Sequence, residues 1–164
     1  MSNRFHGVFS LLLFSLALMI ALLTLWRQSP WLGFLYLAIC GLCSGGILFA
    51  YCAKCRVRLD NCSHVFPGRL TRLLPRRKQG PYSYGDIGGT VFFLAVIILF
   101  PQYWLLKEMA ALGLFWLLAI FAVTEILLFV CRQCKNTACL MCPKLQMPED
   151  RATEDRGRGK KIIR

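Results

Sequence analysis

Four stretches of this 164-residue chain are long, apolar and almost free of charge. Residues 9–26, 31–51 and 87–106 contain no charged side chain, and residues 109–131 contain only Glu125. A helix needs about 20 apolar residues to cross a bilayer, and helices satisfy their own backbone hydrogen bonds inside lipid. The pattern therefore predicts an all-α membrane protein with four transmembrane helices.

The order of the four stretches predicts two tandem helical hairpins with a Cys-rich cytoplasmic cap. We assign residues 1–143 to one membrane domain, which includes a Cys-rich cytoplasmic loop at 52–86. Residues 144–164 are rich in charge, and we expect a disordered cytoplasmic tail there.

A signal peptide is the alternative interpretation of the amino-terminal segment. Arg4 would be its charged region and residues 9–26 its apolar region. That apolar region is long for a signal peptide, and Arg27 follows it where small residues should precede a cleavage site. We therefore expect the first span to be retained.

The net charge of +12 is concentrated in two segments. The loop 52–86 contains eight basic and two acidic residues, and the segment 132–164 contains nine basic and four acidic residues. Because Lys and Arg are enriched on the cytoplasmic side, we expect a multi-pass protein of the cytoplasmic (inner) membrane with both termini in the cytoplasm. This topology accounts for the basic excess, so we expect contacts with membrane lipid and none with nucleic acid.

Seven of the nine cysteines follow the second and fourth spans in two matching groups. The pair Cys52 and Cys55 recurs 79 residues later as Cys131 and Cys134, and the spans before the two pairs repeat at nearly the same offset. Tandem hairpins have the same orientation, so both groups should face the cytoplasm, where structural disulfides are rare. Thiols at these spacings in a reducing compartment indicate metal binding or redox chemistry.

Eight residues near the span ends are candidate metal ligands. A Cys-x2-Cys turn places two sulfurs on one metal, and two such turns complete a tetrahedral site. The repeat predicts one centre between the two Cys-x2-Cys pairs and a second centre between the other four residues. The set is Cys52, Cys55, Cys62, His64, Cys131, Cys134, Cys139 and Cys142.

Two cofactors remain open for these ligands, an iron–sulfur cluster and zinc. The spacing Cys134-x4-Cys139-x2-Cys142 resembles that of plant-type ferredoxins, which implies an iron–sulfur cluster. His64 favours zinc, which accepts mixed sulfur and nitrogen ligands. Thiol–disulfide chemistry, palmitoylation and simple packing are the alternatives to metal binding.

Glu125 is the one ionisable residue within a span. It lies six residues before Cys131, about 9 Å along a helix at 1.5 Å per residue. We expect it to form an ion pair with Lys54 or His6, or to take part in proton transfer or in binding a quinone headgroup.

The second span is rich in small residues, whereas the first is rich in Leu and Phe. Small residues let helices approach closely. We therefore expect the second span to be central in the bundle and the first to be lipid-facing or peripheral. The small residues are Cys40, Gly41, Cys43, Gly45 and Gly46.

The third span has a cap, a glycine pair and a proline. Asp86 is expected to be the N-cap of its helix. Gly88 and Gly89 predict close helix packing. Pro101 predicts a kink near the outer interface.

The favoured function is that of a small integral membrane metalloprotein with Cys-ligated centres at the cytoplasmic face. These centres would pass electrons between a soluble partner and a membrane complex or quinone. We expect an electron-transfer or accessory subunit, since no nucleophile motif, phosphate loop or paired carboxylates are present. The alternatives are a structural zinc-knuckle protein that docks or assembles a protein partner, and a thiol oxidoreductase that faces the cytoplasm.

Overall fold

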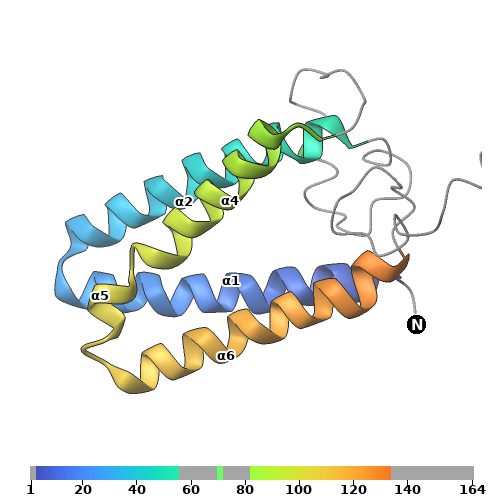
Figure 1. The fold of residues 1–164 in the computed structure, drawn as a ribbon. Coiled ribbons are helices and arrows are strands. Elements are labelled where there is room, and N and C mark those ends of the chain that lie inside the picture. Colours follow the sequence, from blue (N-terminus) through green and yellow to red (C-terminus); the bar gives the residue numbers. More distant parts are fainter. Residues whose placement is uncertain (1–2, 56–69, 72–81, 134–164) are drawn as a thin grey trace, which may run out of the picture.

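The computed structural model describes residues 3–55, 70–71 and 82–133, and this part of the chain is helical without strands (Figure 1). Its long elements are α1 (Asn3–Gln28), α2 (Pro30–Ala50), α4 (Tyr84–Leu99) and α6 (Met109–Glu125). Short elements extend them: η1 (Cys52–Lys54), α5 (Gln102–Leu105), the π-helix η3 (Ile126–Val130) and η4 (Cys131–Gln133). The prediction of an all-α chain with four long apolar helices is confirmed.

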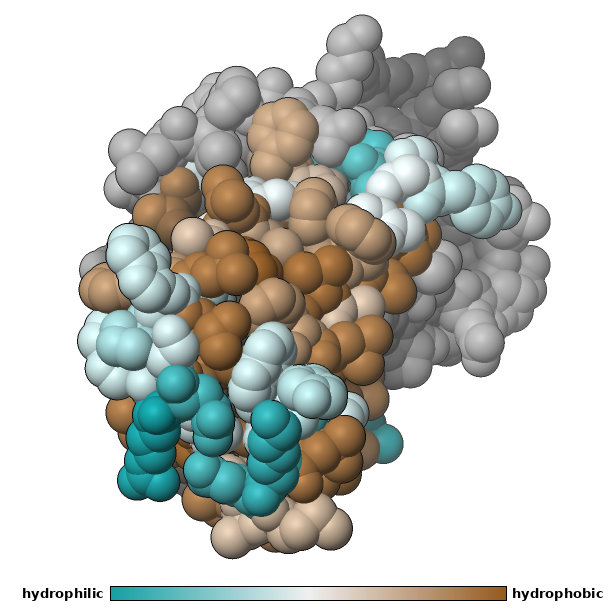
Figure 2. Space-filling view, turned by 90° about the vertical axis from the view of Figure 1, so that its left-hand side faces the viewer, coloured by the Kyte–Doolittle hydropathy of each residue, from teal (hydrophilic) through white to brown (hydrophobic). Residues whose placement is uncertain are grey.

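In the described part of the chain, four helical segments are long and apolar enough to cross a membrane, so the architecture is that of a multi-pass membrane protein. They are Phe5–Gln28, Pro30–Lys54, Tyr84–Leu105 and Met109–Val130. Their outward side chains are apolar over most of the length, and Leu42 and Trp31 are among the most exposed. Figure 2 views the end of the bundle that carries the short links, where a small hydrophilic patch is surrounded by apolar side chains.

The four helices form two hairpins that pack against each other through antiparallel pairs (Figure 1). The helix α6 lies along α1, α4 lies along α2, and α1 also packs on α2. The first hairpin is thus closed by direct helix packing, whereas in the second hairpin α5 links α4 to α6 and contacts both α1 and α6.

The expectation that the first span is peripheral is wrong, because α1 packs on both α2 and α6, whereas the second span lies between α1 and α4 as a central helix should. Ala17, Ala21 and Leu25 lie four residues apart on α1 and are fully buried. Their spacing forms one narrow stripe, and the two alanines let the adjacent helices approach closely. The overall Leu and Phe content of α1 did not reveal this stripe.

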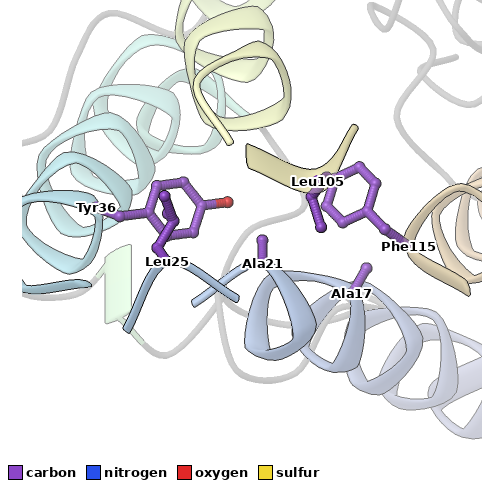
Figure 3. Close-up of a cluster of buried hydrophobic side chains, with 6 residues drawn as sticks. All are labelled: Ala17, Ala21, Leu25, Tyr36, Leu105 and Phe115. Atoms are coloured by element: carbon purple, nitrogen blue, oxygen red, sulfur yellow. The ribbon is translucent and has the colours of Figure 1, made fainter. Parts of the chain in front are cut away.

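One buried cluster joins four elements near the end of the bundle that carries the short links (Figure 3). Tyr36 of α2, Leu105 of α5 and Phe115 of α6 pack around the α1 stripe in this cluster. These residues lie far apart in sequence, so the cluster holds the two hairpins together. Its members are Ala17, Ala21, Leu25, Tyr36, Leu105 and Phe115.

Pro101 interrupts the third span, as predicted. Its nitrogen has no hydrogen, so the carbonyl of Ile97 loses the donor that an uninterrupted helix would provide. The hydroxyl of Tyr36 donates to this carbonyl at 3.1 Å, and the side chain of Gln102 donates to the next one, that of Ile98, at 2.7 Å. The break is therefore compensated by two side chains where water is scarce.

The small-residue predictions are correct only in part. A Cβ on Gly46 would lie 2.6 Å from the ring of Phe93 on α4, so this glycine does allow close packing. Apart from chain neighbours and the backbone of the same helix, no atom of the described residues lies within 4 Å of such a Cβ on Gly41 or Gly45, and the same holds for Gly88 and Gly89. Close helix packing at these four positions is therefore a wrong prediction. Successive helical residues differ by about 100° in direction, which separates Gly46 from Gly45.

The two cysteines among the small residues of the second span, Cys40 and Cys43, agree better with the expected packing. Cys43 is buried, and Cys40 is partly buried against the cluster of Figure 3. Packing is therefore a sufficient role for both cysteines. The tail 144–164 and most of the loop 52–86 lie outside the described residues.

Candidate functional site

The first Cys-x2-Cys pair occupies a tight turn directly after the second span. The helix α2 ends at Ala50, and η1 begins at Cys52. The backbone N–H of Cys55 donates to the carbonyl of Cys52 at 3.2 Å, so the two cysteines close one turn. Cysteines at this spacing are typical of ligand pairs that share one metal ion.

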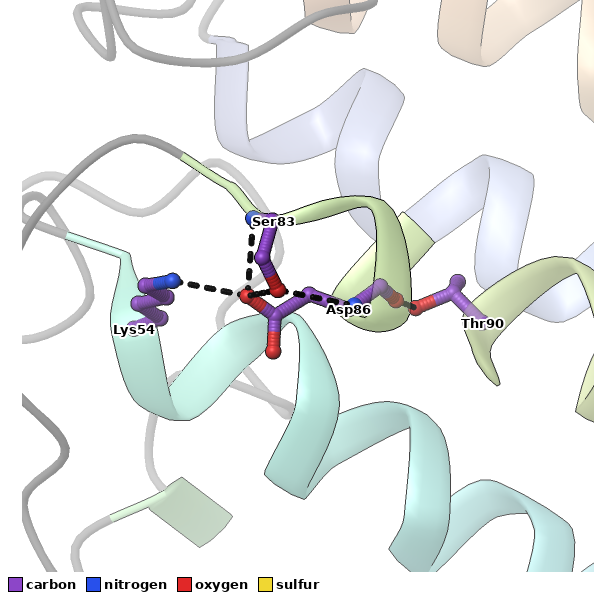
Figure 4. Close-up of polar contacts among 4 residues, drawn as sticks. All are labelled: Lys54, Ser83, Asp86 and Thr90. Atoms are coloured by element: carbon purple, nitrogen blue, oxygen red, sulfur yellow. Dashed lines mark hydrogen bonds and ion pairs between the residues drawn. The ribbon is translucent and has the colours of Figure 1, made fainter. Parts of the chain in front are cut away.

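A buried ion pair fixes this turn to the start of α4 (Figure 4). The Nζ atom of Lys54, which lies between the two cysteines, is 2.7 Å from Oδ2 of Asp86. The side chains are 15% and 4% exposed, respectively, so the pair is largely shielded from solvent. Tyr51, the residue before η1, stacks on Tyr82 with ring centroids 4.4 Å apart.

Asp86 has a different role at its helix from the one predicted. The N-cap of α4 is Ser83, whose side chain accepts from the backbone N–H of Asp86 at 3.3 Å. Oδ2 of Asp86 accepts from the backbone N–H of Ser83 at 3.0 Å and from its hydroxyl at 2.9 Å. Asp86 is therefore the third helical residue of a capping box, and the same oxygen also receives Lys54.

The second Cys-x2-Cys pair begins in an equivalent way. The helix α6 continues as the π-helix η3, and η4 starts at Cys131. Cys131 is partly buried. The ends of η1 and η4 lie at the same end of the bundle, opposite the short links (Figure 1). Cys134 lies outside the described residues.

Glu125 pairs with His6, one of the two predicted partners. Nδ1 of His6 lies 3.1 Å from Oε2 of Glu125, and the side chains are 18% and 21% exposed. The imidazole ring also stacks on Phe129 of η3, with centroids 4.5 Å apart and planes inclined by 5°. The alternative partner, Lys54, is bound to Asp86 because α2 packs on α4, whereas α6 packs on α1.

The structure describes three of the eight predicted metal ligands, Cys52, Cys55 and Cys131. Within the described ranges, no three His, Cys, Asp or Glu side chains lie close enough together to hold a metal ion. Cys131 is described as well, and the structure does not bring it into one ligand group with Cys52 and Cys55. The ligands that lie outside the described residues are Cys62, His64, Cys134, Cys139 and Cys142.

Two features of this end of the bundle were not predicted. The pairing of Lys54 with Asp86 needs the contact between α2 and α4, which no local pattern provides. The capping box did have a signal, because Ser83 is followed three residues later by the acidic Asp86, a pattern typical of a helix start.

Comparisons with protein-family models, curated proteins and solved structures find no match to this chain.

Proposed function

We propose that this chain is an integral membrane metalloprotein that holds one or two Cys-ligated centres where the loop 52–86 meets the bundle. The centres pass electrons between a soluble partner and a membrane complex or quinone. In this proposal the Cys-bearing end faces the cytoplasm, as the basic residues of the loop and tail favour.

The observation that carries the proposal is the repeated placement of the Cys-x2-Cys pairs. A 3-10 turn starts at the first cysteine of each pair, Cys52 in η1 and Cys131 in η4. Both turns follow a membrane-length helix and lie at one end of the bundle. Two equivalent turns at one end are what a shared site between the hairpins requires.

The local surroundings of the first turn support a preorganised site. The ion pair between Lys54 and Asp86 fixes the turn from within, because Lys54 is one of the two residues between the cysteines. Ligands that are oriented before binding lose less conformational entropy when the metal arrives. The turn is therefore a rigid place to hold two sulfurs.

The ligand assignment follows the repeat. Cys52 and Cys55 would share one centre with Cys131 and Cys134, and the other four candidates would form the second. An iron–sulfur cluster would supply one-electron redox chemistry in such a site. The ferredoxin-like spacing within the second group supports this cofactor for the electron-transfer function.

A structural role for zinc is the second candidate function. Here the centre would clamp the ends of α2 and α6, and the basic loop would dock a protein partner. The helix arrangement favours this candidate, because α2 packs mainly on α4 and α1, while α6 packs mainly on α1. A metal between their ends would therefore add a connection that helix packing does not supply.

Paired substitutions test the ligand assignment. The variants Cys52→Ser/Cys55→Ser and Cys131→Ser/Cys134→Ser should each remove the same centre from anaerobically purified protein. The matched control is Cys40→Ala/Cys43→Ala, which changes two cysteines inside the span and should leave the metal content unchanged. Loss of different centres in the two paired variants would refute the shared site, and unchanged metal content in both would refute these ligands.

A further inference from the structure

The His6–Glu125 pair has the geometry of a carboxylate–imidazole dyad. Oε2 of Glu125 lies 3.1 Å from Nδ1 of His6, and both side chains are largely shielded from solvent. A neutral imidazole whose Nδ1 faces a carboxylate carries its hydrogen there and keeps the lone pair on Nε2. The carboxylate thus orients the ring and makes Nε2 a proton acceptor.

The second ring nitrogen of His6 is the accepting atom of this dyad. Among the described residues, Nδ1 of His6 is the ring nitrogen with a hydrogen-bond partner, and Nε2 has none. A partly buried imidazole nitrogen without a partner is uncommon, since buried polar atoms are usually hydrogen-bonded. The pair therefore has the capacity to accept one hydrogen bond from a ligand.

Aromatic side chains surround the dyad on the surface of the span. Phe129 covers one face of the imidazole, and Phe5 lies edge-on to it with centroids 5.8 Å apart. Phe9 stacks on Phe5 at 6.1 Å. All three phenylalanines are exposed on the apolar outside of the bundle. A flat, apolar ring that arrives from the lipid could pack among them.

The backbone at the dyad is also irregular. The α-helical part of the fourth span ends at Glu125, and the π-helix η3 contains Phe129. Short π-helical turns occur frequently at functional sites. Glu125 and Phe129, which contact the imidazole from the fourth span, therefore lie where the α-helix changes to a π-helix.

We propose that the His6–Glu125 dyad binds the headgroup of a membrane quinol, with Nε2 of His6 accepting a hydrogen bond from a headgroup hydroxyl. A quinol has the two properties that this place selects, an aromatic ring that partitions into lipid and a hydroxyl that donates. The inference rests on the proposed function, because it names the membrane-side substrate of the electron-transfer centre.

The dyad would also serve the oxidation of the quinol. A Cys-ligated iron centre would supply the oxidant when bound, and for each electron that the headgroup gave up it would release one proton from a hydroxyl. Nε2 of His6 takes that proton, and Glu125 stabilises the resulting imidazolium. The proton then leaves to water, so the dyad is restored for the second electron and the second proton.

Nitrogen NMR of the full chain in lipid nanodiscs tests the binding step. The protein contains two histidines, so labelling histidine with nitrogen-15 gives few signals, and His6→Asn identifies those of His6. A decyl-tailed hydroquinone is the probe. We expect the Nε2 resonance of His6 to shift as the probe is added. Decane, which has the hydrocarbon tail but no headgroup, should cause no such shift.

Variants connect the binding to the dyad. Glu125→Gln should weaken binding of the hydroquinone at least tenfold, because the amide can donate to Nδ1 as well as accept from it and so no longer enforces the tautomer with a free lone pair on Nε2. The matched control is Glu108→Gln, which removes a carboxylate at the opposite end of the bundle and should leave binding unchanged. Unchanged binding in Glu125→Gln, or no shift at His6, would overturn the quinol site. This readout does not depend on the metal. The quinol site can therefore be refuted while the metal analysis supports the proposed function, and the metal analysis can refute that function while binding of the hydroquinone is still observed.

Discussion

Lys54 and Asp86 form an ion pair of 2.7 Å that joins the first Cys-x2-Cys turn to the amino-terminal end of α4. The pair connects two elements 32 residues apart in sequence, and the described structure places it at the end of the bundle that carries the cysteines. It is thus a direct link between the membrane domain and the candidate metal site.

Removing one member of this buried pair should destabilise the protein more than removing one member of an exposed pair. Lys54→Met leaves the 4%-exposed carboxylate of Asp86 without its cation, and breaking a buried pair costs about 3 kcal/mol. Unfolding of the detergent-solubilised protein would measure the change in free energy of unfolding.

The exposed pair of Arg27 and Glu108 provides the control. Its atoms are 4.0 Å apart and its side chains are 75% and 35% exposed, so Arg27→Gln should cost less than about 0.5 kcal/mol. Equal losses in both variants would contradict a special role for the Lys54–Asp86 pair.

Tyr36→Phe should destabilise the bundle by about 1–2 kcal/mol. The substitution removes the hydroxyl that donates to Ile97, whose carbonyl lacks its usual donor because of Pro101. The control is Tyr103→Phe, a change on an exposed ring whose hydroxyl has no hydrogen bond to the described residues. If thermal unfolding gave the same midpoint for both variants, compensation of the proline break by Tyr36 would be wrong.

Gly46→Ala and Gly45→Ala should have opposite effects. A Cβ at position 46 would lie 2.6 Å from the ring of Phe93, and overpacking costs about 1–3 kcal/mol. Position 45 is open, and alanine favours a helix over glycine by about 1 kcal/mol. Phe93→Leu should relieve the Gly46→Ala defect in the double variant, which unfolding measurements would show as non-additive changes. Additive losses would argue against the contact.

Membrane-impermeant thiol labelling tests the orientation. In intact cells the native cysteines should resist the reagent, because the proposed topology assigns each of them to a span or to the cytoplasmic side. A cysteine introduced at Lys107, in the link between α5 and α6, should react from outside. Labelling of the native cysteines in both proteins, with no labelling at position 107 of Lys107→Cys, would require the opposite orientation.

Much of the fold could be predicted from the sequence because the bilayer imposes a strong length and charge pattern. The four spans, the break at Pro101 and the option of a pair between His6 and Glu125 all followed from it. The central position of α1 could not be predicted, because it depends on Ala17 and Ala21 sharing one face of a helix that is apolar on every side.

The site was harder to predict, because its contacts depend on which helices pack together. Lys54 could reach either Glu125 or Asp86 as far as the sequence indicates, and the packing of α2 on α4 selects Asp86. The Cys-x2-Cys pairs were visible as a repeat, and the 3-10 turns that begin at Cys52 and Cys131 add a shared local conformation. The metal itself stays a prediction.

The most direct test of the account is metal and acid-labile sulfide analysis, with a visible spectrum, of the full chain purified anaerobically in detergent. The account predicts bound metal, and iron with near-equal sulfide and absorption near 400 nm if the centre passes electrons. Colourless protein with bound zinc would contradict electron transfer and support the structural alternative. Protein without metal, with all nine cysteines reactive toward a thiol reagent, would contradict the central claim.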